Sequence, residues 1–172
     1  MRKNSTYKRF AGLLLSGKLW STAMVFLVAA CSSIDCPLNS KVYTKYKLAG
    51  EVKKIDGKLT AIIDLGDEND STWFNQITAV DSFEIPMSYQ REEDKIHLIY
   101  TDTVTTYHDT IVIKKTNTPH FEAVDCSPAF FHHIENISYT RNCIDSIVIN
   151  NPNVNYDASK STFYIYFKSI KY

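Results

Sequence analysis

Short stretches in which apolar and polar residues alternate recur along this chain. The apolar residues of SFEIPMSY (82–89) fall on every second position, and DTIVIKK (109–115) and FYIYFK (163–168) repeat the pattern. A period of two residues places one set of side chains on one face of a β-strand. The alternation therefore predicts strands, separated by turns, over most of the chain.

Similar stretches extend the prediction to an all-β fold. Further candidate strands are 41–48, 59–65, 95–101, 121–125, 135–140 and 144–150, with turn residues at 56–57, 66–70, 117–119 and 150–153. About 8–10 short strands at this spacing predict an antiparallel β-sandwich or a partly open barrel. Pro86, inside a candidate strand, indicates a sheet edge or a bulge because proline lacks an N–H donor.

The first thirty residues have the composition of a secretory signal. Residues 1–18 carry five basic side chains and no acidic one, and residues 19–30 (LWSTAMVFLVAA) are apolar or small. Twelve helical residues rise about 18 Å, less than the roughly 30 Å of a bilayer core. The alternative, a transmembrane anchor over 10–30, places Lys18 inside the bilayer at high cost. We therefore expect an N-terminal signal helix at 1–30.

The residues at the C-terminal end of this segment predict a lipid anchor. Leu27-Val28-Ala29-Ala30-Cys31 resembles the bacterial lipobox, in which the chain is cut before the cysteine and a diacylglycerol is attached to its sulfur. Several acyl chains on one residue hold a protein firmly to a membrane. We expect lipidation at Cys31, a short tether over 31–40 and a single β-rich domain over 41–172.

Removal of the signal also changes the net charge. The whole chain has 19 basic and 19 acidic residues, and removing the five basic ones leaves 14 against 19, a net charge of about −5. Nucleic-acid binding requires basic patches, so no nucleic acid is expected as a partner. The membrane contact is expected to come from the lipid, since adhesion to anionic head groups also needs basic residues.

Several motifs resemble those of a family of lipid-anchored envelope proteins of Bacteroidota, a domain of unknown function. The matching segments are 36–39 (CPLN), 119–122 (PHFE), 125–126 (DC), 131–132 (FH), 144–147 (IDSI) and 153–157 (NVNYD). The resemblance spans most of 31–168 and is densest after Asp109. It implies secretion, lipidation and a compact β domain, and it implies no activity.

The other cysteines face an oxidising compartment if the chain is exported. Cys36, Cys126 and Cys143 allow three single pairings, and their spacing does not choose among them. The family pattern contains cysteines at the first two positions, which implies a Cys36–Cys126 disulfide and a buried free thiol at Cys143. Such a bridge would close about 90 residues and stabilise by up to about 4–5 kcal/mol.

The tether also bears on location. Five residues from Cys31 to Cys36 reach at most about 18 Å, so a pinned Cys36 would keep the domain close to the membrane. Residues 32–35 contain one acidic residue, whereas surface-export signals of Bacteroidota resemble an acidic cluster at this position. Both features favour the periplasmic side of the outer membrane.

Two clusters have side chains that bind metals in other proteins. The first gathers His120, Asp125, Cys126, His132 and His133 within fourteen residues, and the second is the acidic loop at Asp64 and 67–70. Irregular spacing argues against zinc in the first, and the second lacks the spacing of a calcium loop. Motifs for nucleophilic, phosphate-binding or metalloprotease chemistry are absent from the sequence. We therefore expect no metal, no cofactor and no enzymatic activity.

Four Asp-Ser/Thr dipeptides are each followed by a methyl-bearing residue. The hydroxyl residues are Ser71, Thr103, Thr110 and Ser146. This pattern resembles the O-glycosylation acceptor of secreted Bacteroidota proteins. The alternative is ordinary strand-entry chemistry, in which Asp, Ser and Thr bond to nearby backbone.

The sequence as a whole indicates a non-catalytic envelope lipoprotein with a structural or partner-binding role. Loops are the preferred contact sites, and the candidates are the 117–133 segment, with His120, Phe121, Phe130 and Phe131, and the 150–157 loop. The alternative function is binding of a glycan or another ligand, including calcium. Aromatic stacking in an exposed groove would favour that alternative.

Overall fold

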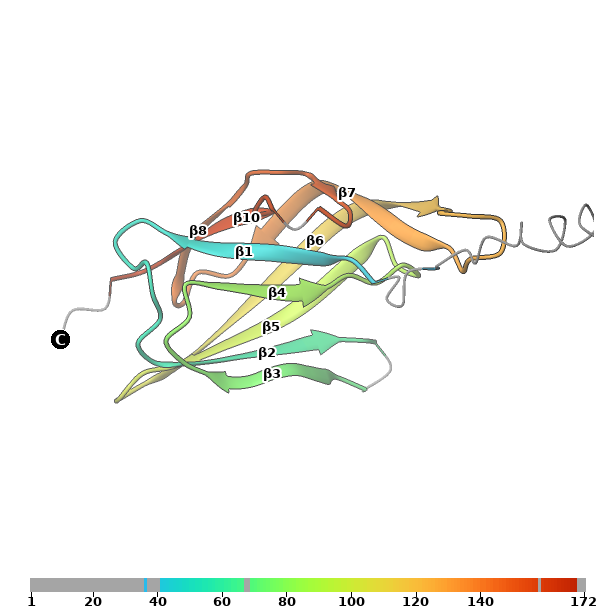
Figure 1. The fold of residues 1–172 in the computed structure, drawn as a ribbon. Coiled ribbons are helices and arrows are strands. Elements are labelled where there is room, and N and C mark those ends of the chain that lie inside the picture. The colour runs from blue at the N-terminus through green and yellow to red at the C-terminus, as the bar shows by residue number, and fades with distance from the viewer. Residues whose placement is uncertain (1–35, 37–40, 67–68, 158, 170–172) are drawn as a thin grey trace, which may run out of the picture. The chain divides into compact units, whose positions relative to one another are not determined.

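The computed structural model describes residues 36, 41–66, 69–157 and 159–169, and these form ten β-strands and no helix (Figure 1). The chain divides into two compact units, Met1–Cys36 and Pro37–Tyr172. Cys36 alone is described in the first unit, so the expected signal helix and Cys31 lie outside the described residues. The second unit is the β domain.

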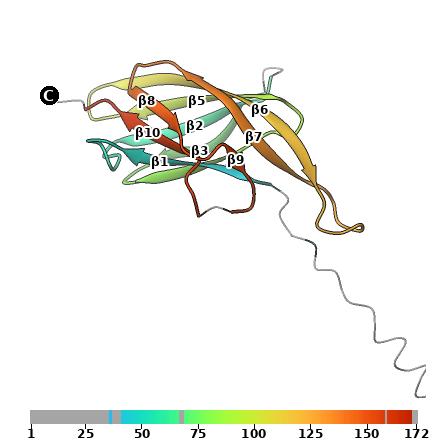
Figure 2. The ribbon, with the colours of Figure 1, turned by 90° about the horizontal axis from the view of Figure 1, so that it is seen from above.

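The ten strands of the β domain form two sheets. They are β1 (Tyr43–Ala49), β2 (Lys58–Asp64), β3 (Ser71–Ile77), β4 (Ser82–Pro86), β5 (Glu93–Thr101), β6 (Thr106–His120), β7 (Ala129–Tyr139), β8 (Ile144–Ile149), β9 (Asn153–Val154) and β10 (Phe163–Phe167). One sheet has the order β4-β1-β10-β8, and the other has the order β3-β2-β5-β6-β7-β9 (Figures 1 and 2). The prediction of an all-β, sandwich-like fold is confirmed.

The two sheets enclose an apolar core. Tyr46 of β1 packs between Phe83 of β4 and Phe163 of β10, with ring centroids 4.9 and 4.8 Å away. Leu98 and Ile111 of the larger sheet belong to the same buried cluster. Burial alternates along β10 as the sequence predicts, because residues two apart share one face.

One strand pair differs from a purely antiparallel arrangement. β1 and β10 run parallel, with Tyr46 opposite Phe163, whereas every other pairing among the described strands is antiparallel. Parallel neighbours need a long connection between them. β1 and β10 meet this condition because the rest of the domain separates them in sequence.

Proline occupies edge positions in both sheets. Pro86 ends β4, the edge strand of the smaller sheet, which confirms the edge predicted from the sequence. Pro119 lies near the end of β6, opposite Phe130, where β6 has run past its other neighbour, β5. A missing N–H is tolerated at both positions because no second strand needs it.

Two local predictions are wrong, and two strands have no predicted counterpart. Residues 121–125 form the loop between β6 and β7, and 117–119, predicted as a turn, continue β6 through pairing with β7. The strands without a predicted counterpart are β3 and β9. STWFNQI of β3 is largely exposed on both faces of an edge strand and shows no clear alternation, and β9 has only two residues, which begin at the end of the predicted turn 150–153.

Candidate functional site

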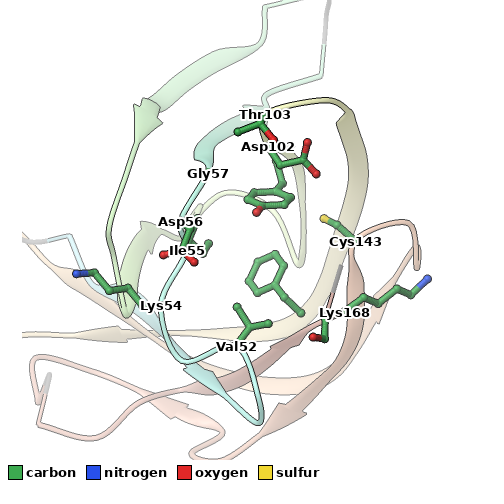
Figure 3. A pocket seen from close by; sticks show the side chains of 12 residues that line it. Val52, Lys54, Ile55, Asp56, Gly57, Asp102, Thr103, Cys143 and Lys168 are labelled. Atoms are coloured by element: carbon green, nitrogen blue, oxygen red, sulfur yellow. The ribbon is translucent and has the colours of Figure 1, made fainter. Parts of the chain in front are cut away.

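A pocket of about 410 Å³ opens at the end of the domain where β5 turns into β6 (Figure 3). We call it the end pocket. It is lined by Val52, Lys54, Ile55, Asp56, Gly57, Tyr100, Asp102, Thr103, Cys143, Phe167, Lys168 and Ser169. Its walls come from the β1–β2 loop, the β5–β6 turn, the start of β8 and the end of β10.

Aromatic rings form one wall of the end pocket. The ring centroids of Tyr100 and Phe167 lie 6.1 Å apart, and Tyr107 stacks on Tyr100 at 6.2 Å with an angle of 18° between the planes. Gly57 packs closely against this wall, because a Cβ there would lie 2.4 Å from the Thr101 carbonyl oxygen and 2.7 Å from the Tyr100 ring. The absence of a side chain at Gly57 therefore sets the shape of the pocket.

Charged residues stand at the rim. Figure 3 shows the ammonium groups of Lys54 and Lys168 directed away from the centre of the end pocket. The Asp102 Oδ1 accepts hydrogen bonds of 2.7 Å from the backbone N–H groups of Val104 and Thr105, which fixes the β5–β6 turn. An apolar wall with a mixed-charge rim suits a small amphipathic group.

Cys143 contributes a thiol that is poorly suited to nucleophilic chemistry. The residue is buried and is the free cysteine among the described residues. Burial and the neighbouring Asp109 carboxylate raise the pKa of its thiol far above the ordinary value. A thiol must lose its proton to attack, so this one is inert at neutral pH.

Asp109 holds the wall beside the end pocket. Its buried carboxylate accepts hydrogen bonds from the Thr140 hydroxyl at 2.6 Å and from the N–H groups of Asn142, Cys143 and Ile144 at 2.8, 2.7 and 2.9 Å. Burial raises the carboxyl pKa, but these donors outweigh burial and leave the pKa below its usual value. The carboxylate thereby attaches the β7–β8 turn to β6.

The opposite end of β6 forms a projecting hairpin with β7. β5 begins at Glu93, opposite Lys114, so residues 115–120 of β6 extend beyond β5 (Figure 1). Several ring contacts involve the hairpin. Phe131 stacks on His120 with centroids 4.2 Å apart and meets Tyr156 edge-on at 5.2 Å, while Phe130 stacks on Tyr89 at 5.1 Å.

The candidate binding residues of this segment are thus partly brought together. His120 and Phe131 join Tyr156 of the predicted 150–157 loop, and Phe130 lies in a separate contact. Phe121 stands apart in the β6–β7 loop, with 62% of its surface exposed. Sequence reasoning missed Tyr89 because its partner lies forty-one positions away, and local patterns do not show such pairings.

Polar residues beneath the β4–β5 loop form a buried cluster, which we call the inner polar cluster. The Lys115 Nζ lies 3.1 Å from Asp94 Oδ2 and donates to the Arg91 carbonyl at 2.5 Å. The His132 Nδ1–H donates to Asn117 Oδ1 at 2.6 Å, and Asn117 Nδ2 donates to the Arg91 carbonyl at 2.9 Å. These side chains donate hydrogen bonds to the backbone of the loop, so the cluster has a structural role.

The cysteine and histidine positions bear on the zinc alternative. Cys36 and Cys126 are each disulfide-bonded, so neither thiolate is available to a zinc ion. His132 is buried and His133 is exposed, because adjacent strand residues point to opposite faces. Within the described ranges, no three His, Cys, Asp or Glu side chains gather as a metal site would require, and no helix is long and apolar enough to cross a membrane.

The acidic loop after β2 is described in part, since 67 and 68 lie outside the described residues. Asp64 forms a 2.8 Å ion pair with Lys95 and accepts the Gly66 N–H at 2.8 Å. The hydrogen bond from Lys95, followed by that from Gly66, lowers the pKa of Asp64 to about 2. Its carboxylate is therefore already engaged by a cation of the protein itself.

The four candidate glycosylation residues occupy different surroundings. Ser71 and Thr103 are exposed, at the start of β3 and in the β5–β6 turn, whereas Thr110 and Ser146 are half-buried in β6 and β8. Thr110 follows the fully buried Asp109. A modifying enzyme would therefore reach Ser71 and Thr103 more easily in the folded domain.

Comparison with known proteins identifies the family. Searches of curated proteins and of solved structures each gave no match to this chain. A family of unknown function, DUF6452, matches residues 58–167, which include β2 to β10. The match contains the part of the end-pocket lining from Tyr100 to Phe167, whereas the lining residues of the β1–β2 loop and those after β10 lie outside it. The chain belongs to this family.

Proposed function

We propose that the protein is a non-catalytic, lipid-anchored lipoprotein of the bacterial envelope whose β domain binds a small amphipathic ligand, such as a sugar ring, in the end pocket. The signal-like segment 1–30 and the lipobox-like residues ending at Cys31 support the anchor. The short tether supports a position on the periplasmic side of the outer membrane of a Bacteroidota cell.

The single observation that carries the binding proposal is the concave end pocket of about 410 Å³ with Tyr100 and Phe167 in its wall. Ligand sites of proteins occupy about 300–1,000 Å³ and combine apolar walls with a few polar groups. Aromatic faces stack on the apolar face of a sugar, and the rim carboxylates of Asp56 and Asp102 are acceptors for its hydroxyls.

Binding fits the chemistry of this site better than catalysis does. The Cys143 thiol stays protonated, and the Asp109 carboxylate beside it is occupied by four donors. Catalysis needs a group with a pKa near the working pH and access to substrate. The two buried titratable groups of this wall meet neither condition.

A glycan array and a thermal-shift screen with mono- and disaccharides test the proposal. We expect a ligand that raises the melting temperature of the wild type, since native-state ligands stabilise by mass action. Thr103→Trp, at the exposed rim, should abolish the shift by filling the mouth. Thr72→Trp, exposed on β3, is the matched control. Equal shifts in the two variants would contradict binding at the end pocket.

A second candidate function is binding of an envelope protein through the aromatic contacts of His120, Phe131 and Tyr156. Edge-on and stacked rings at a half-exposed surface are typical of protein contact sites. Photo-crosslinking from position 133 in living cells, with position 47 as an exposed control on β1, tests it. A Phe130→Ser/Phe131→Ser variant that retained every crosslinked partner would remove this candidate.

The anchor and the orientation are tested separately. Mass spectrometry of the N-terminal peptide should find a diacylglycerol-modified Cys31, and an unmodified N-terminus would contradict the anchor. An impermeant protease applied to intact cells should leave the protein uncut until the cells are lysed. Cleavage in intact cells would place the domain on the outer surface.

A further inference from the structure

We propose that the tip of the β6–β7 hairpin, which presents Phe121 and Val124, enters the interfacial region of the phospholipid bilayer to which the chain is anchored. This inference rests on the lipid anchor proposed above and adds a second contact between protein and membrane. The tip is the loop 121–128, between β6 and β7.

The tip lies at the end of the domain at which the first strand begins. β1 starts at Tyr43, opposite Pro86, the last residue of β4. The β4–β5 loop then leads to Glu93, opposite Lys114, and β6 continues from there toward the tip. The first strand therefore starts at the same end of the sandwich as the one at which the hairpin projects.

The tip loop contains a disulfide-bonded cysteine. Cys126 lies in the tip loop, and both Cys126 and Cys36 are disulfide-bonded, whereas Cys143 is free. The Cys36–Cys126 pairing that the family resemblance implies would join the tip loop to a position five residues after the proposed lipidation site. Five residues reach at most about 18 Å.

The surface of the tip suits a lipid interface. Val124 is 98% exposed and Phe121 is 62% exposed, among the most exposed large apolar residues of the described chain. Between residues 116 and 140 the sequence contains no Lys or Arg, and Glu122 lies between Phe121 and Val124 while Asp125 follows them. Attraction to anionic head groups is therefore excluded, and the partner is a zwitterionic interface that accepts apolar side chains.

Two apolar side chains are too few to hold a free protein to a membrane. A tether raises their effective concentration at the bilayer, so a weak contact becomes occupied once the lipid is in place. The contact would set the orientation of the domain. β6 has 15 residues and spans about 50 Å, so the end pocket at its other end would face away from the bilayer.

Depth-dependent quenching of tryptophan tests this arrangement. Trp73 is the only tryptophan after residue 30, so Trp73→Phe gives a background free of tryptophan in the mature chain. Val124→Trp reports on the tip. Val104→Trp is the matched control, because Val104 is also a strongly exposed valine, at 76%, but lies in the β5–β6 turn at the other end. Both variants are placed in phosphatidylcholine vesicles with brominated acyl chains.

The anchor is imposed chemically so that the result does not depend on lipidation by cells. The mature chain from residue 31 is coupled through Cys31 to a maleimide-bearing phospholipid, since Cys143 is buried and Cys36 and Cys126 are bonded. We expect Val124→Trp to lose about half of its fluorescence and to shift to the blue, as for a side chain about 5–10 Å deep. Val104→Trp should be unaffected.

The outcomes are distinct. Equal quenching of both tryptophans, or quenching of neither, overturns the membrane contact of the tip even if Cys31 proves to be lipidated in cells. Quenching of Val124→Trp alone supports the contact even if the mass of the native N-terminus shows another anchor. The membrane contact of the tip can therefore be refuted or supported independently of the proposed lipid anchor.

Discussion

The Nζ of Lys115 lies 3.1 Å from the Oδ2 of Asp94 inside the core, and the two side chains are 0% and 5% exposed. Burial lowers the pKa of Lys115, and the Asp94 carboxylate opposes this shift. Asp94 also accepts the Ser88 N–H at 3.2 Å, and Lys115 donates to the Arg91 carbonyl, so the pair connects the β4–β5 loop to the larger sheet.

Removing one partner of this pair should cost far more than removing both. Lys115→Met should lower the free energy of unfolding by about 3–5 kcal/mol, because it removes the nearer cation from the buried Asp94 carboxylate and leaves the longer, 3.9 Å ion pair with Arg91. Asp94→Leu/Lys115→Met should recover at least half of the loss. Urea unfolding measures both, with exposed Lys114→Met as the control, expected within about 0.5 kcal/mol of wild type. A double variant as unstable as the single would refute this account.

Stability should fall as the pH is lowered from 6.5 toward 4. Burial, followed by the charge of Lys115, lowers the pKa of His132 from 6.5 to about 4. Between pH 6.5 and 4 the histidine is protonated in the unfolded chain but not in the folded chain. The free energy of unfolding therefore decreases as the pH falls through this range, by up to about 3 kcal/mol. Unfolding at stepwise pH should show this slope for wild type and for the exposed control His133→Gln. His132→Gln should reduce this slope by the amount that corresponds to about one proton taken up on unfolding.

Asp109→Asn should destabilise the domain by about 2–3 kcal/mol, because an amide nitrogen cannot accept the hydrogen bonds that one carboxylate oxygen accepts. Asp109 has a lowered pKa, so its contribution is present above the unfolded pKa of about 3.8 and is lost as the pH falls through the folded value. Asp145→Asn, at an exposed ion pair with Arg141, should change stability little. Similar unfolding midpoints for the two variants would contradict the role given to Asp109.

The Cys143 thiol should be silent toward a thiol reagent until the domain unfolds. Its burial and raised pKa predict a reaction with Ellman's reagent slower than that of a free thiol by on the order of 100-fold or more. Unreduced protein whose Cys31 is blocked should show one reactive thiol in urea and none in buffer. Three thiols in urea would show that Cys36 and Cys126 are not bonded.

The alternation of apolar and polar residues predicted much of the fold, because the side chains of a strand that point into the core lie at every second position. The same two-residue period places three charged residues inward. Asp109 and Lys115 lie on the same face of β6 as the buried Ile111 and Ile113, and Asp94 lies on the same face of β5 as Ile96. The expectation that charged residues face solvent hid all three. The period of a strand tells which residues point inward but not which residues they contact. The contact between Asp94 and Lys115 could be seen only once the register of β5 and β6 was known.

The end pocket was not predictable for a related reason. Its lining comes from four separate segments of the chain, each of which appears in the sequence as an ordinary turn or strand end. The aromatic contacts of the hairpin were predicted in part, because His120 and Phe131 belong to one segment. Tyr89 and Tyr156 arrive from other loops, and their positions depend on how the loops fold back.

The parallel pairing of β1 with β10 bears on the export that we propose. The Lys45 N–H bonds to the Thr162 hydroxyl across 117 positions, so the smaller sheet closes only when β10 is present. Closing so long a loop is slow, since its entropy cost comes before the contacts that stabilise it. During the proposed export from the N-terminus, the smaller sheet would stay open until β10 has crossed the membrane, and a translocation channel requires a chain that is not fully folded.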